Sequence, residues 1–188
     1  MPIFSYSFFS GETPLIIAAN KGDIHTMKKL ISQNANVNHV AYRIWPHGGH
    51  PVLHYAIESG SVEAVKLLIE AGANVNEITS NLIIHQKRKQ TNERNLFLLA
   101  SAINSHAPIN IIQALINGGA DINKGGLTTG KWTPLMIASY RGYSDALKLL
   151  LKAGADKTIK NNHDGGRLAI DYAKEQGHVD IVKILNNK

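Results

Sequence analysis

The chain has 188 residues, of which 44% are hydrophobic and 18% are charged, so it can bury a continuous core and is not composed like a disordered tail. It contains no cysteine, which excludes disulfides and cysteine-based zinc sites. Its formal net charge of +6 permits binding to an acidic partner. No stretch of the sequence approaches the ~18 consecutive apolar residues of a membrane span. The first residues lack the basic start that is typical of a signal peptide.

The first recognisable unit begins near residue 13. Residues 13–18, TPLIIA, predict a helix that opens at Thr-Pro, where the fixed backbone of proline suits the first turn. Gly22 is expected to end this helix, because glycine tolerates a left-handed backbone. A second helix is predicted next, since apolar residues recur there at helical spacing; they are Ile24, Met27, Leu30 and Ile31.

The same unit recurs four more times along the chain. A glycine stands four residues after the alanine of the opening signature, except in the third copy, which has Asn104. The opening returns at residues 51–56, 95–100, 133–138 and 168–173. Polar segments rich in Asn and Asp close the units at residues 35–38, 72–76, 119–123 and 154–156. Because one helix pair cannot bury its apolar stripe alone, the copies are expected to stack.

These signatures resemble the ankyrin repeat family over nearly the whole chain. The resemblance implies an all-α ankyrin-repeat solenoid of about five helix-turn-helix repeats joined by hairpin loops, with the second helices on the convex side. Asn186 replaces the apolar residue of earlier copies, which suits a last repeat that faces water. We expect residues 1–188 to form a single ankyrin-repeat domain, with repeats at approximately 11–38, 49–76, 93–123, 131–160 and 166–188.

The spacing of the repeats exceeds the ankyrin period of about 33 residues. It is 38, 44, 38 and 35 residues between the marker alanines Ala18, Ala56, Ala100, Ala138 and Ala173. Two insertions are therefore expected to extend hairpins, at residues 39–50 and 77–94, and a short third one is expected at residues 105–107, between the two helices of repeat three. Residues 77–94 hold no glycine or proline, so we expect ordered structure there, with Leu82 or Ile84 at least half buried.

Catalytic and metal chemistry find little support in the residues. His47, His50 and His54 are close in sequence, but neither cysteine nor carboxylate falls inside this cluster. The ankyrin resemblance instead assigns the imidazole of His54 to the turn between hairpin and helix. The chain also lacks a phosphate-binding glycine loop, a Gly-x-Ser-x-Gly elbow and a cysteine nucleophile. We therefore expect no enzyme activity, no cofactor and no metal site.

The resemblance also implies where a partner would bind, because ankyrin arrays use a concave groove built from their first helices and hairpin tips. In each repeat, the two positions that follow the marker alanine by two and three residues line the groove, which gives Ala102 and Ile103 in repeat three. Trp132, Tyr140 and Arg141 have the composition of an interface anchor; the alternative is that Trp132 packs only on its own hairpin. The candidate partner-binding residues are Trp132, Tyr140, Arg141, Arg94, Arg167, His50, Glu58 and Lys21.

The predicted function is protein–protein recognition by a monomeric scaffold: an adaptor or inhibitor in the cytoplasm, or a bacterial effector secreted into a host cell. Arg94 and Arg167 would flank the anchor with positive charge, which favours a partner with an acidic, partly apolar surface. The alternative is binding to nucleic acid or another acidic surface through a basic loop at residues 87–89. Nucleic acid is a poor fit, because only 6% of residues are aromatic and the expected groove also carries glutamates; these are Glu12, Glu58 and Glu175.

Overall fold

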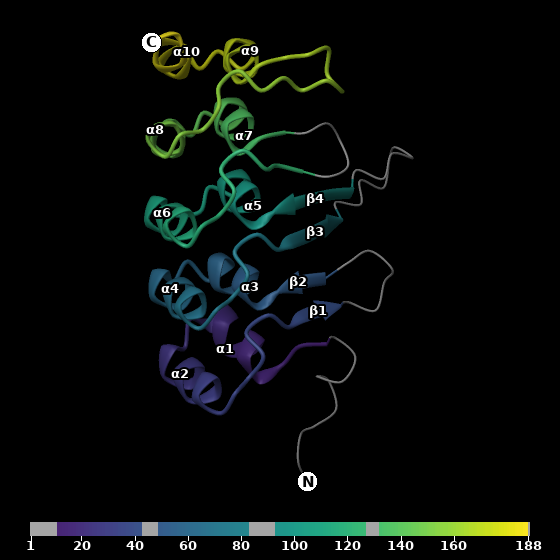
Figure 1. Cartoon of the computed structure of the whole chain (residues 1–188), viewed down its shortest axis with the longest axis vertical. Coiled ribbons are helices and arrows are strands. Elements are labelled where there is room, and N and C mark those ends of the chain that lie inside the picture. The colour runs from purple at the N-terminus through teal and green to yellow at the C-terminus, as the bar shows by residue number, and fades with distance from the viewer. Residues whose placement is uncertain (1–10, 43–48, 83–92, 127–131, 188) are drawn as a thin grey trace.

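The computed structural model describes residues 11–42, 49–82, 93–126 and 132–187, which form ten helices and two β-hairpins. The helices stand in two rows (Figure 1). The inner row, next to the hairpins, contains α1 (Pro14–Lys21), α3 (Val52–Glu58), α5 (Leu98–Asn104), α7 (Pro134–Arg141) and α9 (Ala169–Glu175). The outer row contains α2 (Ile24–Ser32), α4 (Val62–Glu70), α6 (Ile109–Asn117), α8 (Ser144–Lys152) and α10 (Val179–Asn186). These five stacked helix pairs confirm the predicted all-α ankyrin-repeat solenoid.

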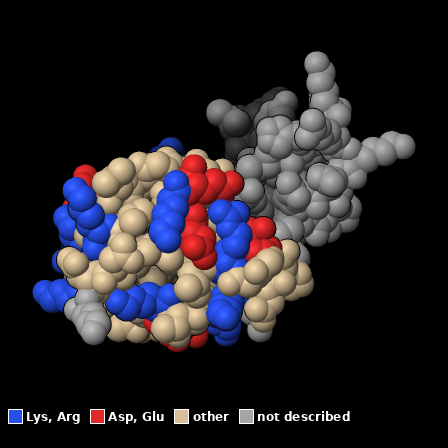
Figure 2. Space-filling model, turned by 90° about the horizontal axis from the view of Figure 1, so that it is seen from above, with Lys and Arg blue, Asp and Glu red and all other residues tan. Residues whose placement is uncertain are grey.

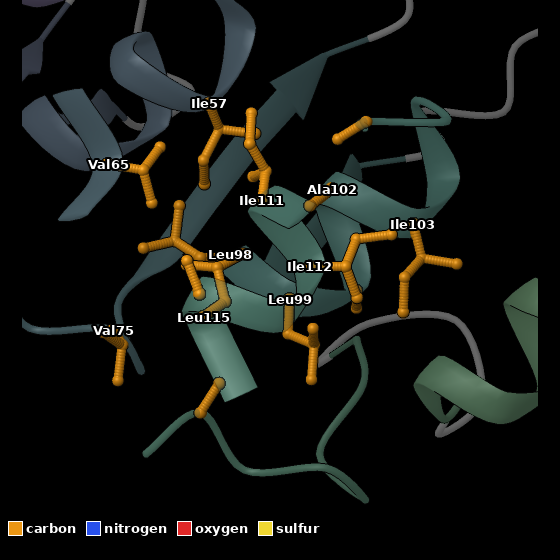
Figure 3. Packing of buried hydrophobic residues seen from close by; sticks show 14 of the residues in the cluster. Ile57, Val65, Val75, Leu98, Leu99, Ala102, Ile103, Ile111, Ile112 and Leu115 are labelled. Atoms are coloured by element: carbon orange, nitrogen blue, oxygen red, sulfur yellow. The ribbon is translucent and has the colours of Figure 1, made fainter. Parts of the chain in front are cut away.

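The core runs through the stack from one repeat to the next. Each outer helix contacts its neighbours in the outer row, and α1 contacts α3 while α7 contacts both α5 and α9. Figure 3 shows buried side chains of α3, α4, α5 and α6 gathered in one cluster at the middle of the stack. Leu68 of α4 is fully buried within the same core, so each repeat depends on its neighbours for burial of its apolar stripe.

Local signals set the ends of the inner helices. Thr13 and Thr133 cap α1 and α7, because each hydroxyl accepts a hydrogen bond of 3.3 Å from the backbone N–H three residues later. Gly22 and Gly142 end the same helices with positive φ of 65° and 72°, a conformation that glycine adopts without the steric cost of a Cβ atom.

The two long insertions form antiparallel hairpins that extend from the inner row (Figure 1). In the first, β1 (Val40–Tyr42) pairs with β2 (Gly49–Pro51). In the second, β3 (Ile78–Leu82) pairs with β4 (Glu93–Phe97) from Ile78–Phe97 to Leu82–Glu93. Ordered structure at residues 77–94 is thus confirmed at the base of the hairpin. The predicted burial of Leu82 or Ile84 concerns side chains outside the described residues, as does the basic run at 87–89.

The third repeat corrects the register deduced from the sequence. In every repeat a residue with a left-handed backbone lies nine positions after the N-terminal cap of the inner helix. In repeat three the cap is Phe97 and the left-handed residue is His106, with φ of 56°. The marker alanine is therefore Ala102 rather than Ala100. The expected insertion at 105–107 shrinks to one residue, since the cap of α6, Pro108, follows the left-handed residue by two positions instead of one.

A ladder of asparagine side chains joins the closing hairpins of neighbouring repeats. In each rung the amide oxygen accepts a hydrogen bond from a backbone N–H one repeat further along; the rungs run from Asn38 to Asn74 (2.7 Å), from Asn76 to Asp121 (2.8 Å) and from Asn123 to Asp156 (2.9 Å). Thr158 holds the equivalent position in repeat four, and its hydroxyl instead donates to Asp156 at 2.7 Å. The ladder fixes how adjacent repeats are aligned.

Candidate partner-binding surface

The carboxyl-terminal ends of the inner helices carry the surface on which a partner was expected. We call it the inner-end surface and define it by the two positions seven and eight residues after each inner-helix cap: Asn20 and Lys21, Glu58 and Ser59, Asn104 and Ser105, Tyr140 and Arg141, and Glu175 and Gln176. All of these side chains except Ser59 and Asn104 are exposed. The corrected register removes Ala102 and Ile103 from this surface, because both are buried in the core.

His50 and Glu58 belong to one cluster in the second repeat. The rings of His50 and His54 stack with centroids 4.2 Å apart, and Tyr55 lies nearly perpendicular to both. Glu58 approaches His54 with Oε1 3.2 Å from Nε2, and His54 itself is buried. Among the described residues, no group of three or more His, Asp or Glu side chains is placed to hold a metal ion. The cluster therefore combines an exposed carboxylate with aromatic rings at the N-terminal half of the surface.

Trp132 and Tyr140 meet at the C-terminal half of the surface. Their rings are perpendicular with centroids 5.4 Å apart, and the side chain of Tyr140 is 39% exposed. Trp132 is half-buried and also packs against Tyr172 of the next repeat, with centroids 4.3 Å apart. Trp132 thus braces the junction of repeats four and five and also borders an exposed tyrosine, so it does not pack on its own hairpin alone, and its role in binding stays a prediction.

Arg167 lies beside this aromatic group, but its charge is compensated within the chain. Its guanidinium forms ion pairs with Asp164 and Glu175 and lies 4.5 Å over the ring of Tyr172. The hydrogen bond to Glu175 raises the pKa of Arg167 above its ordinary value. Burial, reinforced by Asp164, raises the pKa of Tyr172 to about 12, and the Tyr172 hydroxyl donates to that carboxylate at 2.8 Å. Arg167 therefore helps to build the last hairpin.

Arg141 has a different environment. Its Nε and Nη2 atoms both donate to the side-chain oxygen of Asn104 in the preceding repeat, at 3.1 and 2.8 Å. Within the described parts of the chain, no carboxylate lies within ion-pair distance of Arg141. Asn104 was missed as a site residue because the sequence register placed it opposite the helix-ending glycines. The contact joins positions 37 residues apart, which no local pattern reveals.

Two other predicted site residues lie apart from this group. Lys21 is exposed at the end of α1, three repeats from Tyr140. Arg94 lies on β4, where its backbone is opposite Asn81, and its side chain is outside the described residues. In the corrected register Leu96, which is buried, precedes the helix cap in place of Arg94.

Charges of both signs alternate at the C-terminal end of the stack. Figure 2, which views the molecule from that end, shows basic side chains interspersed with acidic ones. Two outer helices illustrate the pattern, since Lys148 lies 3.7 Å from Asp145 and Lys183 lies 3.9 Å from Asp180. The described residues in this view do not form one continuous basic track of the kind along which a nucleic-acid backbone binds.

None of the described helices is long and apolar enough to cross a membrane.

A family model described as ankyrin repeats in three copies matches residues 4–79 and again residues 76–161. The chain belongs to the ankyrin repeat family. Ankyrin repeats are generally protein–protein interaction modules and generally have no catalytic activity.

Two curated relatives match only part of the chain. A rice protein (Oryza sativa subsp. japonica) named as probable E3 ubiquitin-protein ligase XBOS34 is 35% identical over 80 residues, which is 43% of this chain and 15% of the relative. A rat protein (Rattus norvegicus) named ankyrin repeat and SAM domain-containing protein 6 is 38% identical over 63 residues, which is 34% of this chain and 7% of the relative. The chain thus spans a small part of the length of each.

Proposed function

We propose that this chain is a non-catalytic scaffold that binds a partner protein through its inner-end surface. The observation that carries the proposal is the contact between Trp132 and the half-exposed Tyr140, directly beside Arg141. Tryptophan, tyrosine and arginine are the residues most enriched among those that dominate binding energy at interfaces. Trp132 contacts Tyr140, and Arg141 follows Tyr140 at the end of α7, so the three residues of repeat four form one anchor.

The proposed partner has an acidic, partly apolar surface, and the scaffold acts as a monomer. The apolar part would cover Tyr140 and the exposed edge of Trp132, and the acidic part would face Arg141. Adaptor and inhibitor roles both fit a scaffold of this kind, since each requires binding without chemistry. The inner-end surface also carries Glu58 and Glu175, which disfavours a nucleic acid as the partner.

The test begins with proteins captured by the intact chain and identified by cross-linking and mass spectrometry, followed by affinity measurements on purified pairs. Tyr140→Ala is the sharpest variant, because its side chain is already partly exposed and its loss creates little cavity. We expect it to weaken binding by ~2 kcal/mol or more. Lys148→Ala, on the outer row, is the matched control and should bind as the unaltered chain does.

Trp132→Ala must be read with a melting curve beside the affinity. Because Trp132 packs on Tyr172, its removal is expected to lower the melting temperature as well as the affinity. Trp132→Phe keeps an aromatic ring at this junction and separates the two effects. A partner whose affinity is unchanged by both Tyr140→Ala and Trp132→Ala would refute this surface as the binding site.

A further inference from the structure

We infer that Arg141, oriented by Asn104 of the preceding repeat, recognises a single carboxylate of an acidic peptide segment in the partner. The inference rests on the proposed function and deepens it, because it assigns one chemical group of the partner to one side chain. It also assigns a positioning role to Asn104, a residue that does not itself need to touch the partner.

The geometry fixes the guanidinium plane. Two N–H groups of Arg141, on Nε and Nη2, converge on one oxygen of Asn104. An arginine carries five N–H donors in a rigid planar fork, so three remain for a ligand. Because the side chain is held before binding, less conformational entropy is lost when a carboxylate docks.

The charge of Arg141 is retained because its partner within the chain is a neutral amide. The structure describes the side chains of two arginines, Arg141 and Arg167, and the second is compensated by Asp164 and Glu175. Lys124, which follows Asn123 at the end of repeat three, lies 4.7 Å over the ring of Phe97. Arg141 is therefore the guanidinium on the inner-end surface that can still pair with an external anion.

A carboxylate fits this site better than a phosphate. A phosphorylated side chain carries about 1.5 to 2 negative charges and is usually bound by a cluster of arginines. Here one guanidinium is available, and Glu175 adds negative charge on the next repeat. The neighbouring Tyr140 and Trp132 offer apolar surface, so the matching segment places an Asp or Glu next to an aromatic or aliphatic residue.

Variants of Asn104 separate positioning from charge. Asn104→Ala leaves the charge of Arg141 but frees its side chain, which should weaken binding about 2- to 10-fold. Asn104→Asp supplies an internal carboxylate that pairs with Arg141, so it should weaken binding by at least about 10-fold and flatten the salt dependence. A purely structural role would leave the salt dependence of the residual binding unchanged. Lys148→Ala, at an exposed position of the outer helix α8 and outside the inner-end surface, is the control.

The probe is a displayed library of random 12-residue peptides, selected on the full-length chain and, in parallel, on Arg141→Gln. We expect Asp or Glu beside an apolar residue in the first selection and no such enrichment in the second. One selected peptide is then titrated against the unaltered chain, the two Asn104 variants and the control, whose melting temperatures are measured alongside. Three forms of that peptide are compared, with its acidic residue retained, changed to the amide, or changed to phosphoserine.

The inference is supported if the amide form binds at least about 10-fold more weakly than the acidic form, and only when Arg141 is present. It is overturned if the amide form binds equally well, if phosphoserine binds far more tightly than the carboxylate, or if selection yields no acidic binder. Peptides that require Tyr140 and Trp132 but not Arg141 would overturn this inference alone. Peptides indifferent to all three residues would overturn the proposed function as well.

Discussion

Replacing Leu68 with alanine tests whether the stack behaves as a chain of nearest-neighbour contacts. Leu68 lies in α4 with no exposed surface, and α4 contacts both α2 and α6. The substitution removes three carbons, which is worth ~2.4 kcal/mol in transfer free energy. The cavity left behind adds to this, so the expected loss in the free energy of unfolding is about 3–5 kcal/mol.

Chemical denaturation measures this loss, and hydrogen exchange locates it. In a repeat stack each unit contacts only its neighbours, so amide protection should fall first in α2, α4 and α6 and persist in α10. Lys66→Ala, on an exposed position of the same helix, is the control and should change stability by less than about 0.5 kcal/mol. A Leu68→Ala chain whose protection falls equally in all five repeats would refute the nearest-neighbour picture.

Three further predictions concern the hairpins and the last repeat. Gly125→Ala should lower the melting temperature by more than Gly60→Ala does. A Cβ at Gly125 would lie 1.4 Å from the carbonyl oxygen of Trp132. A Cβ at Gly60 would meet open space, so Gly60→Ala bears only the cost of a positive φ, about 1–2 kcal/mol. Asn76→Ala should cost about 1–2 kcal/mol by denaturation, since it removes two hydrogen bonds to the next repeat; no measurable loss would show that the ladder is not stabilising. Folding raises the pKa of Tyr172 to about 12 from about 10, so the folded state binds the phenolic proton more tightly than the unfolded state does. The resulting contribution to the free energy of unfolding is present below pH ~10 and is lost as pH rises toward ~12. Tyr172→Phe should lack that component of the pH dependence, and an identical loss in both proteins would assign it to other groups.

The sequence by itself determined the architecture, because the signals for an ankyrin repeat are local. Thr13-Pro14 and Gly22 mark the two ends of one short helix through backbone preferences that need no tertiary contact. Repetition of the same signals along the chain then predicts stacking, since an isolated pair cannot bury its apolar stripe. The positions of the two long insertions followed from spacing alone, and the structure has a hairpin at each.

Only the tertiary structure decided the register of the third repeat. Phe97 stands where other copies have threonine, proline or leucine, and His106 stands where they have glycine, so both the Thr-Pro and the glycine marker are missing there. Packing supplies what the markers do not, because Ala102 must be buried between neighbouring helices while Asn104 faces outward. A shift of two residues would place Ala102 on the inner-end surface and Asn104 at the turn that ends the inner helix.

The tertiary structure also decided which cations remain available to a partner. Both Arg141 and Arg167 were expected to present positive charge to a partner, but the fold places one beside the neutral Asn104 and the other between two carboxylates. The Arg141–Asn104 contact joins two repeats and residues 37 positions apart, so no pattern along the chain encodes it. Coulomb energy falls with distance in space and not with separation in sequence, and for that reason the charge distribution on the inner-end surface is fixed only once the repeats are stacked.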